Sequence, residues 1–459
     1  MQYDLAGARN IFAQTLDSIA EAPSIQASHV LQGYFIVRNG RIGIRATVEN
    51  LRKTKAMEHI DLDGPMAGGF LPLANELARR LSSEARTFGN SNENTFRSYG
   101  QALEAGGAGA REQALKAAVD MDSIDRAEAQ YVAAVASGRS NARIQALETL
   151  VHLEPANARL FANLGGAQYE RRNFQEAVRN YRAATILNPD DPRVWNALGY
   201  ALAWTRDLNG ARQAIEEYGK LAPGDVNVQD SLGEVSFNLG DFDSAAKYFQ
   251  QAAQKSPAEL LKAAEARLMT GDLGSADAFF AKYVGPAKGW RAAYEMAQWD
   301  FLTGRRTRAM AALEALMPTL GGEAKSLTLS RLSIWDLETG SSNAPGSWEV
   351  AGPIRLLLAG KFQDALPELE ARYQRANPSN DGQIRLLLAW ALVETGSIDR
   401  AATLIEMCPL PLSSGEPMVA SLTFPRYFAL RAAVFEKKGK LDEAKKNREL
   451  FLRYGGATK

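Results

Sequence analysis

The sequence predicts a mainly α-helical solenoid of repeated helical hairpins, preceded by a small N-terminal α+β domain. Prolines and alanines recur at a spacing of 34 residues, which is typical of stacked helical hairpins. The prolines are Pro155, Pro189, Pro223 and Pro257, and the alanines are Ala177, Ala211 and Ala245. A separate signal predicts the small domain, because two segments rich in apolar residues flank the turn dipeptide Asn39-Gly40.

The first regular repeat covers residues 158–191. Phe161 and Leu164 share a face of a first helix, and Tyr181 shares a face of a second helix with its flanking alanines. Pro189 ends that helix because it has no N–H to donate. Residues 192–225 repeat the pattern, and a third copy runs to Pro257.

Three glycines stand in the middle of the predicted first helices, at Gly165, Gly199 and Gly233. Glycine inside a helix costs roughly 1 kcal/mol relative to alanine. We therefore expect a neighbouring helix to approach closely at each of these positions, with a large residue of that helix filling the space.

The order large residue, Leu-Gly, Ala, aromatic, Ala, Pro over residues 158–257 resembles the tetratricopeptide repeat family. The resemblance implies a right-handed superhelix in which the first helix of each repeat lines a concave surface. The alternative is a generic helical-hairpin array with a coincidental period, which four prolines in register disfavour.

The same resemblance implies which side chains face a bound partner. These residues are Arg159, Tyr169, Arg193, Asn196, Tyr200, Asn227, Asp230, Glu234 and Phe237. Ala162 and Gly166 stand where the chaperone-binding subclass has a Lys and an Asn, so a carboxylate clamp of that type is not expected. The mixed aromatic and polar set suits an extended or helical peptide. Tyr200 and Phe237 could alternatively fill gaps between the first helices.

Tryptophans are a further class of candidate binding residue, because aromatic anchors often dominate protein interfaces. Trp195 is the large first-helix residue of its repeat and is expected in the core. Trp204 is a candidate binding residue if it is exposed, and otherwise a core residue.

The predicted N-terminal domain spans residues 1–88. A helix is expected over residues 4–22, strands over residues 29–38, 41–50 and 56–62, and a second helix over residues 66–85. Asn39-Gly40 suits a two-residue type I′ turn, which needs two residues at positive φ.

Residues 25–85 resemble the TolB N-terminal-like or FlgO-like domain, which often precedes tetratricopeptide repeats in bacterial regulators. Gly33, Asn39-Gly40, the stretch 46–50 and the stretch 73–81 carry this resemblance. The opening strand of that domain, which ends in Pro-Phe, is absent here. The alternative is an unrelated hairpin and helix that cap the solenoid.

The rest of the chain is expected to be helical repeats of decreasing regularity. Residues 89–157 hold degenerate repeats, 158–257 three regular ones, and 258–459 divergent ones, with loops near residues 340–350 and 409–417. A turn motif, Gly-x-apolar-x-x-Ala, recurs from Gly240 to Gly439. One long interval between these motifs predicts an extra helix over residues 325–338, and a polar last helix is expected near residues 441–454.

Composition narrows the function class. The chain has 53 Lys and Arg and 53 Asp and Glu, so its formal net charge is zero, which argues against a nucleic-acid-binding protein. Its single cysteine, Cys408, excludes an internal disulfide. Only three histidines occur, at His29, His59 and His152, without the spacing of metal ligands.

Neither a catalytic constellation nor a cofactor motif is found, so no enzyme, metal or cofactor is expected. A leader peptide and an apolar run of 18 residues are also not found, which favours a cytoplasmic protein. A periplasmic protein is the alternative if a leader or anchor was removed.

The sequence thus predicts a non-catalytic scaffold that binds a peptide or protein segment in its concave groove. It could be the sensory or recruiting part of a bacterial regulator. The alternative is a repeat enzyme, or an envelope protein that handles carbohydrate or lipid at a site built from scattered residues. A long open groove would favour the scaffold, and a deep pocket with converging carboxylates would favour the alternative.

Overall fold

The computed structural model describes residues 29–50, 56–65, 71–81, 126–127, 130–131, 134, 140–339, 352–408, 410 and 417–455. The expected helix at 4–22, the start of the array at 86–123 and most of the two predicted loops lie outside these residues. The chain divides into two compact units, Met1–Pro155 and Ala156–Lys459. Within the described residues, no helix combines the length and apolar character needed to cross a membrane.

The N-terminal unit contains a three-stranded antiparallel sheet in the order β1-β2-β3. Its strands are β1 (His29–Arg38), β2 (Arg41–Asn50) and β3 (Ala56–Pro65), and helix α2 (Leu71–Leu81) packs on β3. Asn39 and Gly40 join β1 to β2 with φ values of 50° and 72°, which confirms the predicted two-residue turn. Ala46, Ile60 and Leu73 form part of the small core.

Two details of this unit differ from or extend the sequence-based expectation. Strand β3 continues past Leu62 to Pro65, because Asp63, Gly64 and Pro65 still pair with β2. Only residues 71–81 of the expected helix 66–85 are described. The same unit also contains α6 (Ser140–Leu153).

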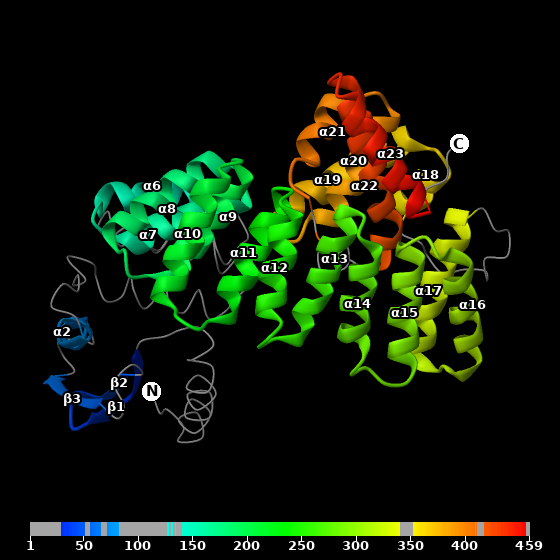
Figure 1. Ribbon diagram of the computed structural model, residues 1–459. Helices are drawn as coiled ribbons and strands as arrows, with labels where there is room; N and C mark the ends of the chain where they lie inside the picture. Colours follow the sequence, from blue (N-terminus) through cyan, green and yellow to red (C-terminus); the bar gives the residue numbers. More distant parts are fainter. Residues whose placement is uncertain are drawn as a thin grey trace. The chain divides into compact units, whose positions relative to one another are not determined.

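The three regular repeats form the predicted helical hairpins. They are α7 (Ala158–Glu170) with α8 (Phe174–Leu187), α9 (Pro192–Trp204) with α10 (Leu208–Leu221), and α11 (Val226–Asn238) with α12 (Phe242–Ala252). Successive hairpins stack side by side in Figure 1. The register alanines Ala177, Ala211 and Ala245 are fully buried, as predicted.

The mid-helix glycines allow each pair of helices to approach closely. A Cβ on Gly165 would lie 2.8 Å from the Tyr181 ring, and a Cβ on Gly233 would lie 2.5 Å from the Phe249 ring. Gly199 is equally tight, with Ile215 at 2.5 Å. The large residue of each second helix therefore occupies the space that glycine leaves.

The array continues through further helices before it turns back. The next helices are α13 (Leu260–Thr270), α14 (Leu273–Val284), α15 (Trp290–Leu302), α16 (Arg306–Leu316) and α17 (Gly322–Thr339), the last of which is the predicted extra helix. Short 3₁₀ turns lie at Pro257–Glu259 and Met317–Thr319. Ala276 and Ala309 are fully buried, as the alanine register predicted.

The C-terminal helices form a second stack that lies against the first (Figure 1). They are α18 (Gly352–Leu358), α19 (Phe362–Arg375), α20 (Gly382–Glu394), α21 (Ile398–Leu404), α22 (Pro417–Lys437) and α23 (Leu441–Arg453). One hydrophobic core extends from Phe237 in α11 to Tyr454 after α23, so the two stacks share an interior.

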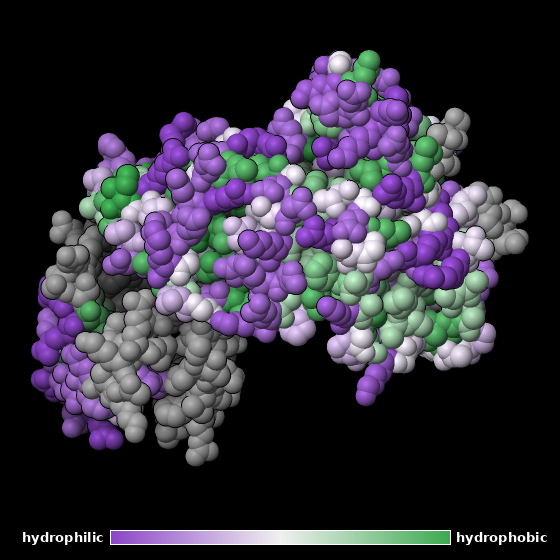
Figure 2. Space-filling model, viewed as in Figure 1, coloured by the Kyte–Doolittle hydropathy of each residue, from purple (hydrophilic) through white to green (hydrophobic). Residues whose placement is uncertain are grey.

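Specific polar contacts fix this return of the chain. The Trp335 indole donates to Ser421 Oγ at 3.0 Å, and Arg426 pairs with Glu338 at 2.8 Å. At the end of the last helix, Tyr454 OH donates to the Leu268 carbonyl at 2.6 Å. In Figure 2, this face of the repeats is mostly hydrophilic, with small separate hydrophobic patches.

Candidate protein-binding groove

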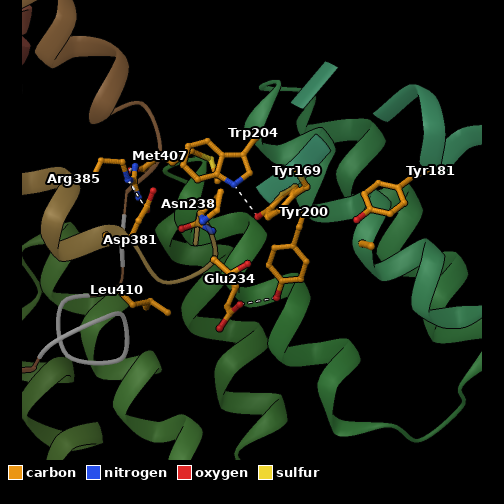
Figure 3. Close-up of a pocket in the computed structure, with 14 residues that line it drawn as sticks. Tyr169, Tyr181, Tyr200, Trp204, Glu234, Asn238, Asp381, Arg385, Met407 and Leu410 are labelled. Carbon is orange, nitrogen blue, oxygen red and sulfur yellow. Dashed lines mark hydrogen bonds and ion pairs between the residues drawn. The ribbon is translucent and has the colours of Figure 1, made fainter. Parts of the chain in front are cut away.

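The first helices of the regular repeats and the C-terminal stack border a partly open cavity of about 440 Å³. On one side it is lined by Tyr169 of α7, Tyr200 and Trp204 of α9, and Glu234 and Asn238 of α11. On the other side it is lined by Pro378, Ser379, Asp381, Gly382, Arg385, Met407 and Leu410. Figure 3 shows these two sets of side chains facing one another.

Aromatic rings make up the wall that the repeats contribute. Trp204 stacks on Phe174 with 4.5 Å between ring centroids, and its indole N–H donates to Tyr169 OH at 2.9 Å. Tyr200 OH donates to Glu234 Oε2 at 2.6 Å (Figure 3). Burial raises the pKa of Tyr200 well above its ordinary value, with a further contribution from the negative charge of Glu234, and burial also raises the pKa of Tyr169. Both tyrosines therefore stay neutral and present rigid, partly polar surfaces.

A charged network lies beneath Tyr200. Lys262 Nζ on α13 is 2.6 Å from Asp230 and 2.8 Å from Glu234, and it also pairs with Glu259 at 3.2 Å. Burial raises the pKa of Asp230 to about 6, although Lys262 acts in the opposite direction. Burial alone would lower the pKa of Lys262, but Glu234 and Asp230 outweigh it and the net shift is upward. Three carboxylates around one ammonium leave this end of the groove negatively charged.

The opposite wall is held by a buried ionic cluster. The Asp381 side chain is 1% exposed and accepts from Arg385 Nε at 3.0 Å and from Arg172 Nη1 at 2.5 Å. Arg385 also donates to the carbonyls of Leu404 and Met407, at 2.9 and 2.6 Å. The Arg385 guanidinium lies 5.0 Å from the centre of the Trp204 ring. This contact joins the C-terminal wall of the cavity to the wall formed by the repeats.

Arg172 has an unusual backbone conformation for its residue type. It sits in the turn between α7 and α8 with φ at 63°, and Arg206 occupies the same place between α9 and α10 with φ at 65°. The later hairpins, such as the one at Gly240, have glycine at this left-handed position. A non-glycine residue there costs about 1 kcal/mol or more. Both arginines offset this cost with bonds to the C-terminal stack.

A second hollow adjoins the first between α7 and α9. It has a volume of about 710 Å³ and shares Tyr181 and Ala197 with the first cavity. Arg159 and Arg193 line it, and Arg193 pairs with Asp191 at 2.9 Å. The two hollows together form a groove over the first helices, which we call the α7–α11 groove.

The structure brings most of the sequence-predicted site residues to this groove. Tyr169, Tyr200, Trp204 and Glu234 line the first cavity, and Arg159 and Arg193 line the second hollow. Asp230 lies in the Lys262 network, while Asn227 bonds to Tyr218 and Ser231. Asn196 is half-buried, and its Oδ1 is a buried atom without a hydrogen-bond partner among the described residues.

The prediction for Phe237 was wrong. Its ring is fully buried in the core and packs edge-on against Phe242 with 5.2 Å between centroids. Position 237 therefore points between the helices of its own hairpin, and Glu234, one turn earlier, faces the cavity instead. Trp195, expected in the core, is only half-buried and donates to the Pro189 carbonyl at 2.8 Å.

The C-terminal wall of the cavity was not among the sequence-predicted site residues. Ser379, Asp381, Arg385 and Met407 come from a part of the chain about 200 residues away, and no local pattern links them to α9. One signal was present, because Arg172 and Arg206 stand where the turn motif of later hairpins has glycine. Those two arginines mark a contact outside their own hairpins.

The stacked hairpins and the groove define a helical-repeat scaffold, and comparisons with known proteins give its family. A family model described as "Tetratricopeptide repeat" matches residues 163–226 and 355–407, and a second model of the same description matches residues 227–258. These segments cover almost all of the three regular repeats and most of the hairpins α18/α19 and α20/α21. Residues 163–258 and 355–407 of this chain therefore match tetratricopeptide repeats.

Individual relatives match only a short part of this chain. The "TPR repeat-containing protein PA4667" of Pseudomonas aeruginosa is 29% identical over 114 residues, 25% of this chain and 19% of that protein. The "Peroxisomal targeting signal receptor" of Eremothecium gossypii is 33% identical over 89 residues, 19% of this chain and 16% of that protein. The chain thus spans less than a fifth of the length of these curated relatives.

Solved structures resemble this chain only weakly. "MamA 41-end from Desulfovibrio magneticus RS-1" covers 36% of this chain and 94% of its own, at 16% identity and a TM-score of 0.33. "Functional Characterization of Pseudomonas Aeruginosa pilF" covers 47% of this chain and 97% of its own, at 18% identity and a TM-score of 0.32. Scores this low carry no information about function.

Proposed function

We propose that this chain is a non-catalytic scaffold that binds a segment of a partner protein in the α7–α11 groove. The observation that carries the proposal is the cavity wall itself, where Tyr169, Tyr200 and Trp204 converge beside Glu234 and Asn238. Aromatic rings with a polar tip give a partner large contact area at a low cost in side-chain entropy. A cavity of about 440 Å³ accommodates one or two side chains of such a segment.

The charges at the cavity favour binding over catalysis. Glu234 is paired with Lys262, and Asp381 is paired with both Arg172 and Arg385. A general acid or base needs a carboxylate that can exchange its proton with a substrate, and these two carboxylates are committed to cations. Among the described residues there is also no group of side chains that could hold a metal ion.

The relatives give the proposal a second line of support. One of them is named as a receptor for a targeting signal, and it is 33% identical to this chain over 89 residues. A groove that selects a short segment of another protein would also suit the recruiting part of a larger bacterial regulator.

Selection from a displayed peptide library tests the proposal. The full-length chain is the bait, and the affinity of each selected peptide is measured by calorimetry on wild type and on Tyr200→Ala. We expect Tyr200→Ala to weaken binding at least about tenfold, because aromatic anchors of this kind carry much of the binding energy.

Ile186→Ala is the matched control, since Ile186 is 81% exposed on α8 and lies outside the groove. Its substitution should leave the affinities unchanged. Peptides that bind folded Tyr200→Ala as tightly as wild type would place the binding surface elsewhere on the chain.

A further inference from the structure

Arg172 and Arg206, the two arginines with a left-handed backbone conformation, contact the same distant segment. Arg172 Nη2 donates to the carbonyls of Tyr373 and Ala376, both at 3.1 Å, and Arg172 Nη1 pairs with Asp381. Arg206 Nη1 donates to the carbonyl of Glu406 at 2.8 Å. The two equivalent hairpin turns thus hold the two ends of residues 373–407.

This segment carries most of the C-terminal wall of the cavity. Ser379, Asp381, Arg385 and Met407 all lie between the two points of attachment or directly beside them, and the segment faces α9 across the cavity (Figure 3). We call residues 373–407 the groove wall. Without it, the faces of α9 and α11 would form an open surface, and with it they form one side of a partly open pocket.

The next three hairpins form the same kind of turn without an arginine, so the turn itself does not require one. Gly240, Gly271 and Gly304 occupy the equivalent turn position in the next three hairpins, with φ between 82° and 86°. Glycine adopts this conformation without strain, whereas arginine does not. The two strained residues occur in the two turns whose side chains reach the groove wall.

We propose that Arg172 and Arg206 are positioning residues that hold the groove wall against α9 and α11, and that they thereby determine how wide and how long a partner segment the groove accepts. The proposal rests on the proposed function for the identity of the ligand class. It predicts that the wild-type groove selects segments with one or two compact anchor side chains. A groove without its wall accepts longer segments that lie along α7, α9 and α11.

Substitution of Arg172 and Arg206 by glycine removes the bonds to the groove wall without disturbing the conformation of the turns. Arg172→Gly and Arg206→Gly remove the bonds to the groove wall, yet they place in each turn the residue that the later hairpins already use there. The hairpins α7/α8 and α9/α10 should therefore keep their fold in the double variant. Unchanged helical circular dichroism checks this point, and the two single variants serve if the double variant does not fold.

Cys408 provides a built-in reporter of wall position. It is the only cysteine of the chain, it is 3% exposed directly after the groove wall, and its backbone N–H donates to the Asn238 carbonyl at 3.2 Å. The thiol is buried beside Tyr427 of α22. We therefore expect it to react with 5,5′-dithiobis(2-nitrobenzoic acid) faster when the wall loosens from the elements packed around it. We expect labelling at least about ten times faster in the double glycine variant than in wild type.

Two further variants separate positioning from a general loss of stability. Arg172→Lys keeps a positive charge beside Asp381 but cannot also bond to both carbonyls, so its labelling rate should fall between those of wild type and Arg172→Gly. Arg267→Ala removes an arginine that pairs with Asp243, away from the groove wall, and should label at the wild-type rate. An unchanged labelling rate in the folded double variant would overturn the proposal.

Peptide binding is the second arm of the test. Peptides selected on wild type should bind the double variant at least about tenfold more weakly, and a new selection on that variant should yield longer peptides. Faster labelling with unchanged peptide affinity would also overturn the proposal, because the wall would then be no part of the partner site. If wild type selects no peptide, the proposed function fails, while the labelling rates still decide whether the arginines hold the wall.

Discussion

Single residues at the hairpin turns show how backbone conformation restricts sequence in this chain. Gly240 has φ at 86°, and a Cβ added there would meet no atom within 4 Å. Its role is therefore conformational, because nothing near it would clash with a side chain. Arg172 and Arg206 hold the same conformation at a cost, which makes them informative about contacts beyond their hairpins.

Substituting Gly240 with alanine tests this conformational role in isolation. We expect Gly240→Ala to lower the free energy of unfolding by about 1 kcal/mol through backbone strain alone, as measured by urea denaturation. Gly274→Ala is the control, because Gly274 lies inside α14 and its Cβ would approach only Asp272, at 3.8 Å. That variant should be as stable as wild type or slightly more stable. Equal effects of the two substitutions on the free energy of unfolding would contradict the conformational role of Gly240.

The titration of Asp230 should be visible in the pH dependence of stability. Its pKa is about 6 in the folded protein and near 3.8 ordinarily, because burial penalises the carboxylate. The folded state therefore binds this proton more tightly than the unfolded chain does. The resulting stability is fully present below about pH 4 and is lost as the pH rises to 6.

Comparison with Asp230→Asn isolates this effect, since asparagine does not titrate. The free energy of unfolding of wild type minus that of Asp230→Asn should decrease by at most about 3 kcal/mol between pH 4 and pH 7. Denaturant titrations at several pH values measure the difference. A difference that stays constant or grows over this interval would contradict the pKa assigned to Asp230.

At the scale of elements, the regular hairpins were predictable because their determinants are local. Proline stops, mid-helix glycines and buried alanines recur every 34 residues, and each acts within one hairpin or between neighbouring ones. The β1–β2 turn was predictable for the same reason, because Asn39 and Gly40 readily adopt the positive φ values that a two-residue turn needs. Phe237 was misplaced because its position in the repeat faces the core, as the fully buried Ala203 at the equivalent position of α9 shows.

A larger residue at Ala211 tests the prediction that the alanines recurring every 34 residues are buried at helix–helix contacts. Ala211 is fully buried, and its carbonyl would lie 3.3 Å from a Cβ on Gly199. Ala211→Leu should therefore lower the free energy of unfolding by about 1–3 kcal/mol. Ala312→Leu is a suitable control because Ala312 is exposed on α16. Similar thermal stability of the two variants would show that the register is wrong.

The turn between β1 and β2 offers an independent test in the N-terminal unit. Gly40 has φ at 72°, where a β-branched residue is a severe outlier. Gly40→Val should speed amide hydrogen exchange in β1 and β2, because the two strands lose their favoured connection. Exchange rates equal to those of wild type would argue against a type I′ turn.

At the scale of the repeat unit, the return of the C-terminal stack could not be predicted from the sequence. The Arg172–Asp381 pair joins positions 209 residues apart, and Tyr454 reaches back to the Leu268 carbonyl. Such contacts depend on the accumulated rotation of many hairpins, which no local pattern specifies. Consequently the part of the candidate site on α7, α9 and α11 was predictable, and the groove wall was not.

The central claim is that a protein segment binds between the α7–α11 groove and the groove wall. Amide hydrogen exchange of the full chain, with and without a library-selected peptide, tests it most directly. We expect protection in α9 and α11 and in residues 379–385, with no change in the outer helices α8 and α10. Protection confined to α8 and α10, or to α13–α16, would contradict the claim.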